Sequence, residues 1–302
     1  MFTFYIRKDC IKSMRDYVIM TDSSCDLPAD IVNKYGVKVV PMGMVFDGNT
    51  YKHHYDWNEL HKEEYYDKLR NGAIGSTSGT NYQDAMDMME SVLAEGKDVL
   101  YLSLSSGLSC SYQNANLAAQ ELREKYENAR VEVVDTRSVC LGVGILVYMA
   151  AKAKEEGKSY DDVLAIVQNN CMRVRHYFAV DDLSALQRSG RISHLTSVVG
   201  SIIGIKPMFT IGENGKVSNH GKVRGRKAAL RQILADGKAN ATSHDIFAIC
   251  HADTEEDAEA VKKQLNEDYP NADIIVGNIG PIIGINTGVN TMAVICLGDE
   301  RV

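Results

Sequence analysis

The first part of the chain alternates short apolar runs with amphipathic stretches. DYVIMTDSS (16–24) is apolar and ends in a polar turn, LPADIVNKYG (27–36) has helical spacing and a closing glycine, and VKVVPMGMVF (37–46) is apolar and β-branched. Short apolar runs bounded by turn residues are typical of buried strands, and apolar residues three and four apart are typical of helices. This strand–helix–strand order predicts a parallel sheet.

The alternation continues to Gly157. We expect a charged surface helix over 57–72, further helices over 82–96, 111–126 and 142–157, and strands over 97–104 and 129–136. Thr80 and Asn81 precede the second of these helices and are candidate caps, since their side chains can accept from free helical N–H groups.

The pattern changes after Gly157. We expect helices over 159–170, 227–239 and 255–269, strands over 176–180, 206–211, 245–252, 272–280 and 292–298, and a hairpin-type turn within 211–217. The sequence therefore predicts two α/β domains, 1–157 and 158–302, of which the second has a mixed sheet.

Composition narrows the class of protein. With 302 residues, 45% hydrophobic and 24% charged, the chain has globular values and room for two domains. A net charge of −7 and the lack of a basic stripe argue against a nucleic-acid surface. Seven scattered cysteines without a C-x-x-C predict reduced thiols in a cytoplasm, not a disulfide framework or a zinc site.

The sequence predicts neither a membrane-spanning segment nor a secretory signal at its start. No apolar run reaches the roughly 18 residues that span a bilayer, so we expect membrane contact to be at most transient. The start, MFTFYIRKDCIKSM, lacks the apolar core and cleavage site of a secretory signal. We interpret residues 1–13 as an extension from an upstream start, outside the fold.

Three polar clusters lie where strands end or helices begin: TDSSCD (21–26), STSGTN (76–81) and SSGLSCSY (105–112). Ligands of open parallel sheets bind beyond the carboxyl ends of the strands, where helix N-termini attract anions. For any single cluster, capping its own helix is the simpler interpretation. Three clusters at one edge favour a site for a carboxylate or phosphate.

The motifs of common enzymes are missing. G-L-S-C-S around Ser109 is not G-x-S-x-G, and GSTSGT (75–80) lacks the G-K-[ST] of a phosphate loop. His251, with Asp253 nearby, is the histidine that ends a strand, and a structural role is the simpler interpretation for it. The spacing of the three histidines between 53 and 61 predicts a solvated face and no metal site.

The stretch VVGSIIGIKPM (198–208) is apolar and interrupted only by small residues before its Lys-Pro. It is either a buried helix followed by a strand or the wall of an apolar pocket. Combined with an anion-holding edge, an apolar pocket would suit an amphiphile with a carboxylate head.

The ordered motifs resemble those of the DegV family of fatty-acid-binding proteins. The resemblance runs from about residue 16 to the C-terminus, through TDSSCDLP (21–28), TS (77–78), SSGLSCSYQNA (105–115), LQRSGRIS (186–193), IKPM (205–208) and R-x-R-K-A (224–228). It implies a three-layer α/β/α domain with a parallel sheet, joined to a two-layer α/β domain with a mixed sheet.

The resemblance also implies a carrier without chemistry or cofactor of its own. It would hold a long-chain fatty acid between its domains and present the carboxylate to a fatty-acid kinase of the dihydroxyacetone-kinase type. Carried over, Thr77 and Ser109 bind the carboxylate, with Ser78 and Ser106 in support. On the side of the head group or the partner, the expected residues are Arg224, His251 and Asn286.

Two segments depart from the family pattern. Cys110 and Ser111 replace a glycine and a threonine beside the head group, and Asn286 in INTGVN (285–290) replaces a histidine. Asn can donate a hydrogen bond but cannot titrate near neutral pH, which puts the hand-off to a kinase in question.

Two alternatives remain open at this point. One is a hydrolase or acyl-transfer enzyme on the same scaffold, using Ser109 or Cys110, which would need a base within reach. The other is a carrier for a different amphiphile, such as a retinoid-like or sterol-like acid.

Overall fold

The computed structural model describes residues 15–181, 183–193 and 204–301. The expected extension over 1–13 and most of the apolar stretch 198–208 lie outside the described residues. Among the described residues, no helix has the length and apolarity needed to cross a bilayer.

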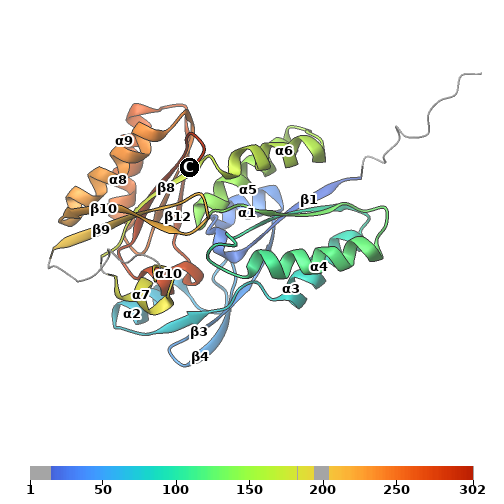
Figure 1. The fold of residues 1–302 in the computed structure, drawn as a ribbon, viewed down its shortest axis with the longest axis horizontal. Coiled ribbons are helices and arrows are strands. Elements are labelled where there is room, and N and C mark those ends of the chain that lie inside the picture. Colours follow the sequence, from blue (N-terminus) through green and yellow to red (C-terminus); the bar gives the residue numbers. More distant parts are fainter. Residues whose placement is uncertain (1–14, 182, 194–203, 302) are drawn as a thin grey trace, which may run out of the picture.

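A parallel sheet forms the centre of the N-terminal part. Its order is β2 (Lys38–Val40), β1 (Tyr17–Asp22), β6 (Asp98–Ser103) and β7 (Val131–Asp135), all parallel. Helices α3 (Tyr82–Ala94) and α4 (Ser111–Lys125) cover one face, and α1 (Ala29–Tyr35) and α5 (Leu141–Glu155) lie on the other (Figure 1).

Alternate side chains of the central strands contribute to two apolar cores, one on each face of the sheet. Val99 and Tyr101 of β6 pack with α3 and α4, whereas Leu100 and Leu102 join the core that contains α5. Side chains of successive strand residues point to opposite faces, so a continuous apolar strand needs helices on both sides. The predicted three-layer arrangement is confirmed.

A six-stranded mixed sheet forms the centre of the C-terminal part. Its order is β10 (Val217–Arg224), β9 (Ile205–Ile211), β8 (Val174–Ala179), β13 (Met292–Leu297), β11 (Ser243–His251) and β12 (Asp273–Asn278). The β11–β12 pair is parallel and the other four pairs are antiparallel. Helices α8 (Arg226–Asn240) and α9 (Glu255–Asp268) pack on one face, and α5 contacts the other. The predicted mixed sheet is confirmed.

The expected strand over 37–46 is wrong in one respect: it is two strands that belong to different sheets. The first strand ends before Pro41, because proline has no backbone N–H to donate to a neighbouring strand. After it, β3 (Met42–Phe46) pairs antiparallel with β4 (Asn49–His53) and β5 (Gly75–Thr77) in a small separate sheet.

The charged helix is shorter than expected and partly buried. It spans α2 (Lys62–Arg70), and the paired rings of Tyr65 and Tyr66 are buried in the main core. Asn81 caps α3 by accepting from the backbone N–H groups of Gln83 and Asp84, which confirms one of the two candidate caps.

Four short elements complete the described chain. They are the 3₁₀ turn η2 (Ser23–Cys25), α6 (Tyr160–Cys171), which packs on α5, α7 (Ser184–Ser189) and α10 (Pro281–Thr287). Since α6 follows residue 157 yet packs on the N-terminal part, the boundary at 157/158 stays a prediction.

Candidate functional site

A narrow cavity lies between the two parts. It contains about 850 Å³ of empty space, its open mouth included, of which the centre of a water molecule can occupy about 100 Å³. Its lining combines Met42, Leu104, Leu108 and Val139 of the N-terminal part with Phe178, Ile211, Ile279, Ile282 and Ile295 of the C-terminal part. This mostly apolar lining suits the apolar portion of an amphiphile.

Polar side chains gather in one part of this lining. Thr77, Ser78, Ser109, Asn286 and Thr287 bring three different segments together: the end of β5, the loop before α4, and α10. Ser78 is exposed, so this part of the lining reaches the surface.

The Ser109 hydroxyl is oriented by a short hydrogen-bond chain. The N–H of Thr80 donates to the Ser111 hydroxyl oxygen at 3.0 Å, and the Ser109 and Ser111 hydroxyl oxygens are 2.9 Å apart. The N–H of Ser111 donates to the Ser109 oxygen at 3.2 Å. Either hydroxyl can donate to the other. When Ser111 is the donor, the Ser109 proton is left for an external acceptor, and a bound carboxylate, which can only accept, favours that arrangement.

The Thr77 hydroxyl oxygen also accepts a hydrogen bond from a neighbouring side chain. Its hydroxyl oxygen accepts from the Asn286 amide at 3.4 Å, and that amide also donates to the carbonyl of Ile282 at 2.7 Å. Ser78 differs, because its hydroxyl donates to the Gly43 carbonyl at 3.1 Å. Among the described residues, Ser78 donates to a backbone carbonyl and Thr77 and Ser109 do not, so the hydroxyls of Thr77 and Ser109 are the ones that can turn a proton toward a carboxylate.

Gly79 makes the close approach of these segments possible. A Cβ at this position would lie 3.1 Å from the Ser109 hydroxyl oxygen and 2.6 Å from the Cys110 sulfur. Cys110 itself is exposed and is the residue before α4.

Ser106 is not among the cavity-lining residues. Its hydroxyl donates to the Asp135 carboxylate at 2.5 Å and its N–H donates to the same group at 3.1 Å. Ser106 therefore holds the loop that carries Ser109 instead of facing the cavity.

The first polar cluster, TDSSCD, turns inward. The buried Asp22 carboxylate accepts from the N–H and hydroxyl of Ser24 and, at 3.1 Å, from the N–H of Leu104. Burial raises the pKa of Asp22. This cluster thus fixes the start of the loop that leads to Ser109, and its hydrogen bonds stay within the protein.

His251 and Arg224 lie away from the cavity lining. His251 directly follows Cys250 in β11, and since Cys250 lines the cavity, strand alternation directs His251 to the opposite face. Its Nδ1 accepts from the N–H of Thr254 at 3.3 Å, and burial lowers its pKa. Arg224 ends β10 and is exposed.

Two basic cavity residues, Arg191 and His176, were not predicted individually. Arg191 lies within LQRSGRIS, a stretch already matched as a motif, which was the available signal. His176 had no signal in the sequence; it is buried on β8, its Nε2 lies 3.2 Å from the Val139 carbonyl, and burial lowers its pKa to about 3. A neutral imidazole is compatible with an apolar lining.

The arrangement offers little for catalysis. In the part of the chain that the structure describes, no histidine or carboxylate is hydrogen-bonded to Ser109 or Cys110, as an activated nucleophile requires. Within the same residues, no group of three or more His, Cys, Asp or Glu side chains could hold a metal ion.

Comparisons with known proteins agree on one family. The model of the DegV family, described as uncharacterised proteins, matches residues 16–299. A DegV domain-containing protein of Clostridium perfringens (strain 13 / Type A) is 39% identical over 291 residues, covering 95% of this chain and 99% of that protein.

Solved structures give the same result. A DegV family protein from Thermus thermophilus, described for its fatty-acid binding, is 32% identical with a TM-score of 0.83, covering 94% of this chain and 100% of that one. DegV of Bacillus subtilis, described as a fatty acid binding protein, is 26% identical with a TM-score of 0.80 and the same coverage. The family model and the relatives match nearly the whole chain, and the chain belongs to the DegV family.

Proposed function

We propose that this protein binds one long-chain fatty acid in the cavity between its two parts. The carboxylate accepts hydrogen bonds from Thr77 and Ser109, with Ser78 beside them and Ser106 supporting the loop. The observation that carries this proposal is the combination of an apolar cavity with two hydroxyls in its polar part, those of Thr77 and Ser109, that can donate to a carboxylate. Relatives from Thermus thermophilus and Bacillus subtilis, described as fatty-acid binders, support it.

The tail supplies most of the affinity. Burial of each CH₂ contributes about 0.8 kcal/mol, so a sixteen-carbon chain gains roughly 10 kcal/mol before the entropic cost of binding is subtracted. Two neutral hydroxyls hold the carboxylate without a lysine, and they mainly set its orientation.

The protein then acts as a carrier with no chemistry of its own. The polar part of the cavity reaches the surface at Ser78, so the bound carboxyl group is within reach of a partner. We propose that this partner is a fatty-acid kinase of the dihydroxyacetone-kinase type and that the exposed Arg224 contacts it. The six described cysteines are all free, which supports a cytoplasmic location.

Native mass spectrometry of the purified protein, followed by denaturation and identification of the released molecule, tests this function. We expect one long-chain fatty acid per chain, bound without covalent attachment. A protein that carries nothing and takes up no added hexadecanoic acid would refute the proposal. A stoichiometric retinoid or sterol acid would instead assign the cavity to another amphiphile.

A further inference from the structure

The loop that carries Ser109 is held by a hairpin of the other part of the molecule. The hydroxyl of the fully buried Ser105 donates to the Gly215 carbonyl at 2.8 Å, across 110 residues of sequence, and accepts from the N–H of Gly107 at 3.2 Å. A Cβ at Gly107 would lie 2.5 Å from the Asn214 carbonyl oxygen, so the two backbones pack directly against each other.

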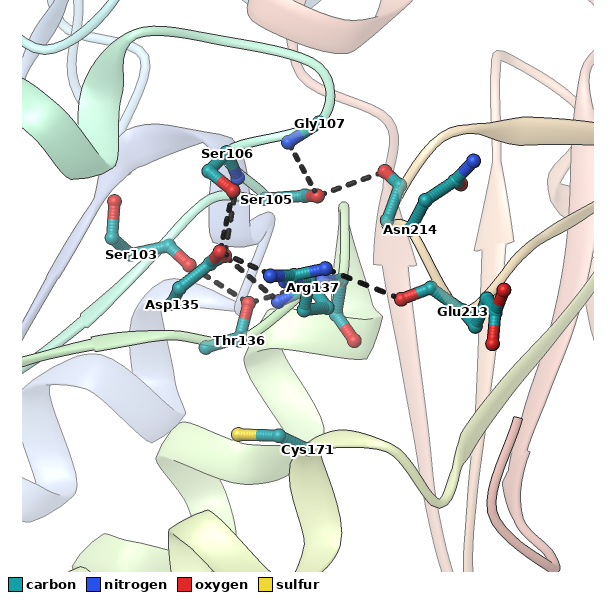
Figure 2. A network of polar contacts seen from close by, with 12 residues as sticks. Ser103, Ser105, Ser106, Gly107, Asp135, Thr136, Arg137, Cys171, Glu213 and Asn214 are labelled. Carbon is teal, nitrogen blue, oxygen red and sulfur yellow. Dashed lines mark hydrogen bonds and ion pairs between the residues drawn. The ribbon is translucent and has the colours of Figure 1, made fainter. Parts of the chain in front are cut away.

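Asp135 holds the same loop from the other side. Figure 2 shows its carboxylate between Ser106 and Arg137. It accepts both hydrogen bonds from Ser106 described above, and from Arg137 it accepts the N–H at 3.1 Å and Nε at 3.0 Å. Arg137 continues to the hairpin, where Nη1 donates to the Glu213 carbonyl at 3.4 Å (Figure 2).

Arg301 also contacts this network, through Arg137 and the hairpin. Its side chain is buried, and its guanidinium donates to the carbonyls of Arg137 at 2.6 Å, Gly212 at 3.4 Å and Cys171 at 2.8 Å. Burial lowers the pKa of Arg301 to about 10, so the group is still charged at neutral pH. A buried charge is retained at a cost, and here it ties three separate backbone segments together.

The hairpin contacts both the cavity and the loop that carries Ser109. Ile211 and Val217 pair across its base, and both line the cavity. Its tip, Glu213–Gly215, touches the loop that carries the carboxylate-binding serine. The same hairpin therefore contacts both the passage for the tail and the support of the head-group site.

We propose that Arg301, Asp135 and the hairpin tip form a latch that positions the Ser109 hydroxyl for the carboxylate, so that these residues determine selectivity for a carboxylate head group without touching it. This inference rests on the proposed function. It assigns Arg301 and Asp135 as positioning residues.

The first test measures loop order without any ligand. In Arg301→Gln and in the milder Ser105→Ala, amide hydrogen exchange of Leu108 and Ser109 should speed up, since both donate to the Ser105 carbonyl. Amides of β6 should be unaffected. Arg173→Gln is the matched control, because Arg173 also donates to a carbonyl, that of Gly298, but makes no contact with the latch.

The second test compares hexadecanoic acid with 1-hexadecanol. We expect Arg301→Gln to weaken binding of the acid by about tenfold and of the alcohol by less than about twofold, with Arg301→Lys recovering part of the loss. A general packing defect would weaken both ligands equally.

Unchanged exchange of the loop amides, or equal weakening of acid and alcohol, would overturn the latch. Should the wild-type protein bind neither ligand, the proposed function fails, and the exchange experiment alone decides on the latch. Should Arg301→Gln not fold, Ser105→Ala carries both measurements.

Discussion

The first and third polar clusters have similar compositions and opposite roles. TDSSCD directs its polar groups inward, where Asp22 is fully occupied by N–H and hydroxyl donors. SSGLSCSY contains one serine that binds the hairpin, one that binds Asp135, and one, Ser109, whose hydroxyl is hydrogen-bonded to Ser111 within the same cluster. The difference shows that a hydroxyl can serve as a binding group when no carboxylate or backbone carbonyl of the protein accepts its proton.

The polar and apolar parts of the cavity also have different roles in binding. The polar part sets orientation through two hydroxyls, whereas the apolar part supplies affinity through burial. Changes in the apolar part should therefore have the larger effect on binding.

The largest effect is expected from Ala293→Phe. Ala293 is buried in β13 and lines the cavity, so a phenyl ring there takes up space that the alkyl chain would occupy. We expect affinity for hexadecanoic acid to fall at least about 100-fold, because several methylene groups of the ligand can no longer be buried. Isothermal titration calorimetry measures this. Ala235→Phe, on the exposed side of α8, is the control; full affinity in Ala293→Phe would place the tail elsewhere.

A smaller loss is expected from the double variant Thr77→Ala with Ser109→Ala. It removes two charge-assisted hydrogen bonds and leaves tail burial intact, so binding should weaken by about 2–3 kcal/mol. Ser76→Ala with Ser91→Ala changes two exposed serines and serves as the matched control. Complete loss of bound lipid in the folded double variant would show that the head group dominates.

Gly79→Ala should weaken fatty-acid binding less than either of these changes, by disturbing the polar part of the cavity alone. The added methyl group displaces the Cys110 side chain and presses on the Ser109 hydroxyl. We expect about tenfold weaker binding of hexadecanoic acid and little change for 1-hexadecanol. Gly79→Ala with Cys110→Ala relieves the closer contact and should regain part of the affinity; no recovery would mean that Ser109 is the group displaced.

The apolar part should also make stability depend on pH. His176 is neutral in the folded protein down to about pH 3, whereas in the unfolded chain it takes up a proton near 6.5. The unfolded state then binds more protons, so the free energy of unfolding falls as the pH drops from 6.5 toward 3. Urea unfolding across this range should show a shallower pH dependence in His176→Gln, and an unchanged one in the control, exposed His61→Gln. An equal slope in all three proteins would contradict this.

The sequence predicted the sheets better than the cavity. Periodicity located most helices and strands, since buried strands and amphipathic helices have distinct spacings. It missed the break at Pro41 within an apolar run and the strands β4 and β5, which are short and polar and are stabilised by pairing with β3. Local pattern contains no information on such pairing.

The roles of the site residues could likewise be predicted only in part from the sequence. Thr77 and Ser109 came from motifs, and both line the cavity, but whether they can donate to a carboxylate depends on Asn286 and Ser111 and on how three segments meet. Nor does a motif show that Ser106 faces Asp135, since Asp135 lies 29 residues further along the chain. Roles that depend on contacts between distant segments required the structure.

A crystal structure of the protein with bound hexadecanoic acid tests the central claim most directly. We predict the carboxylate within hydrogen-bond distance of the Thr77 and Ser109 hydroxyls and the alkyl chain along the passage past Ala293. A lipid bound in the reverse direction, with its carboxylate away from Thr77 and Ser109, or a lipid bound outside this cavity, would contradict the account.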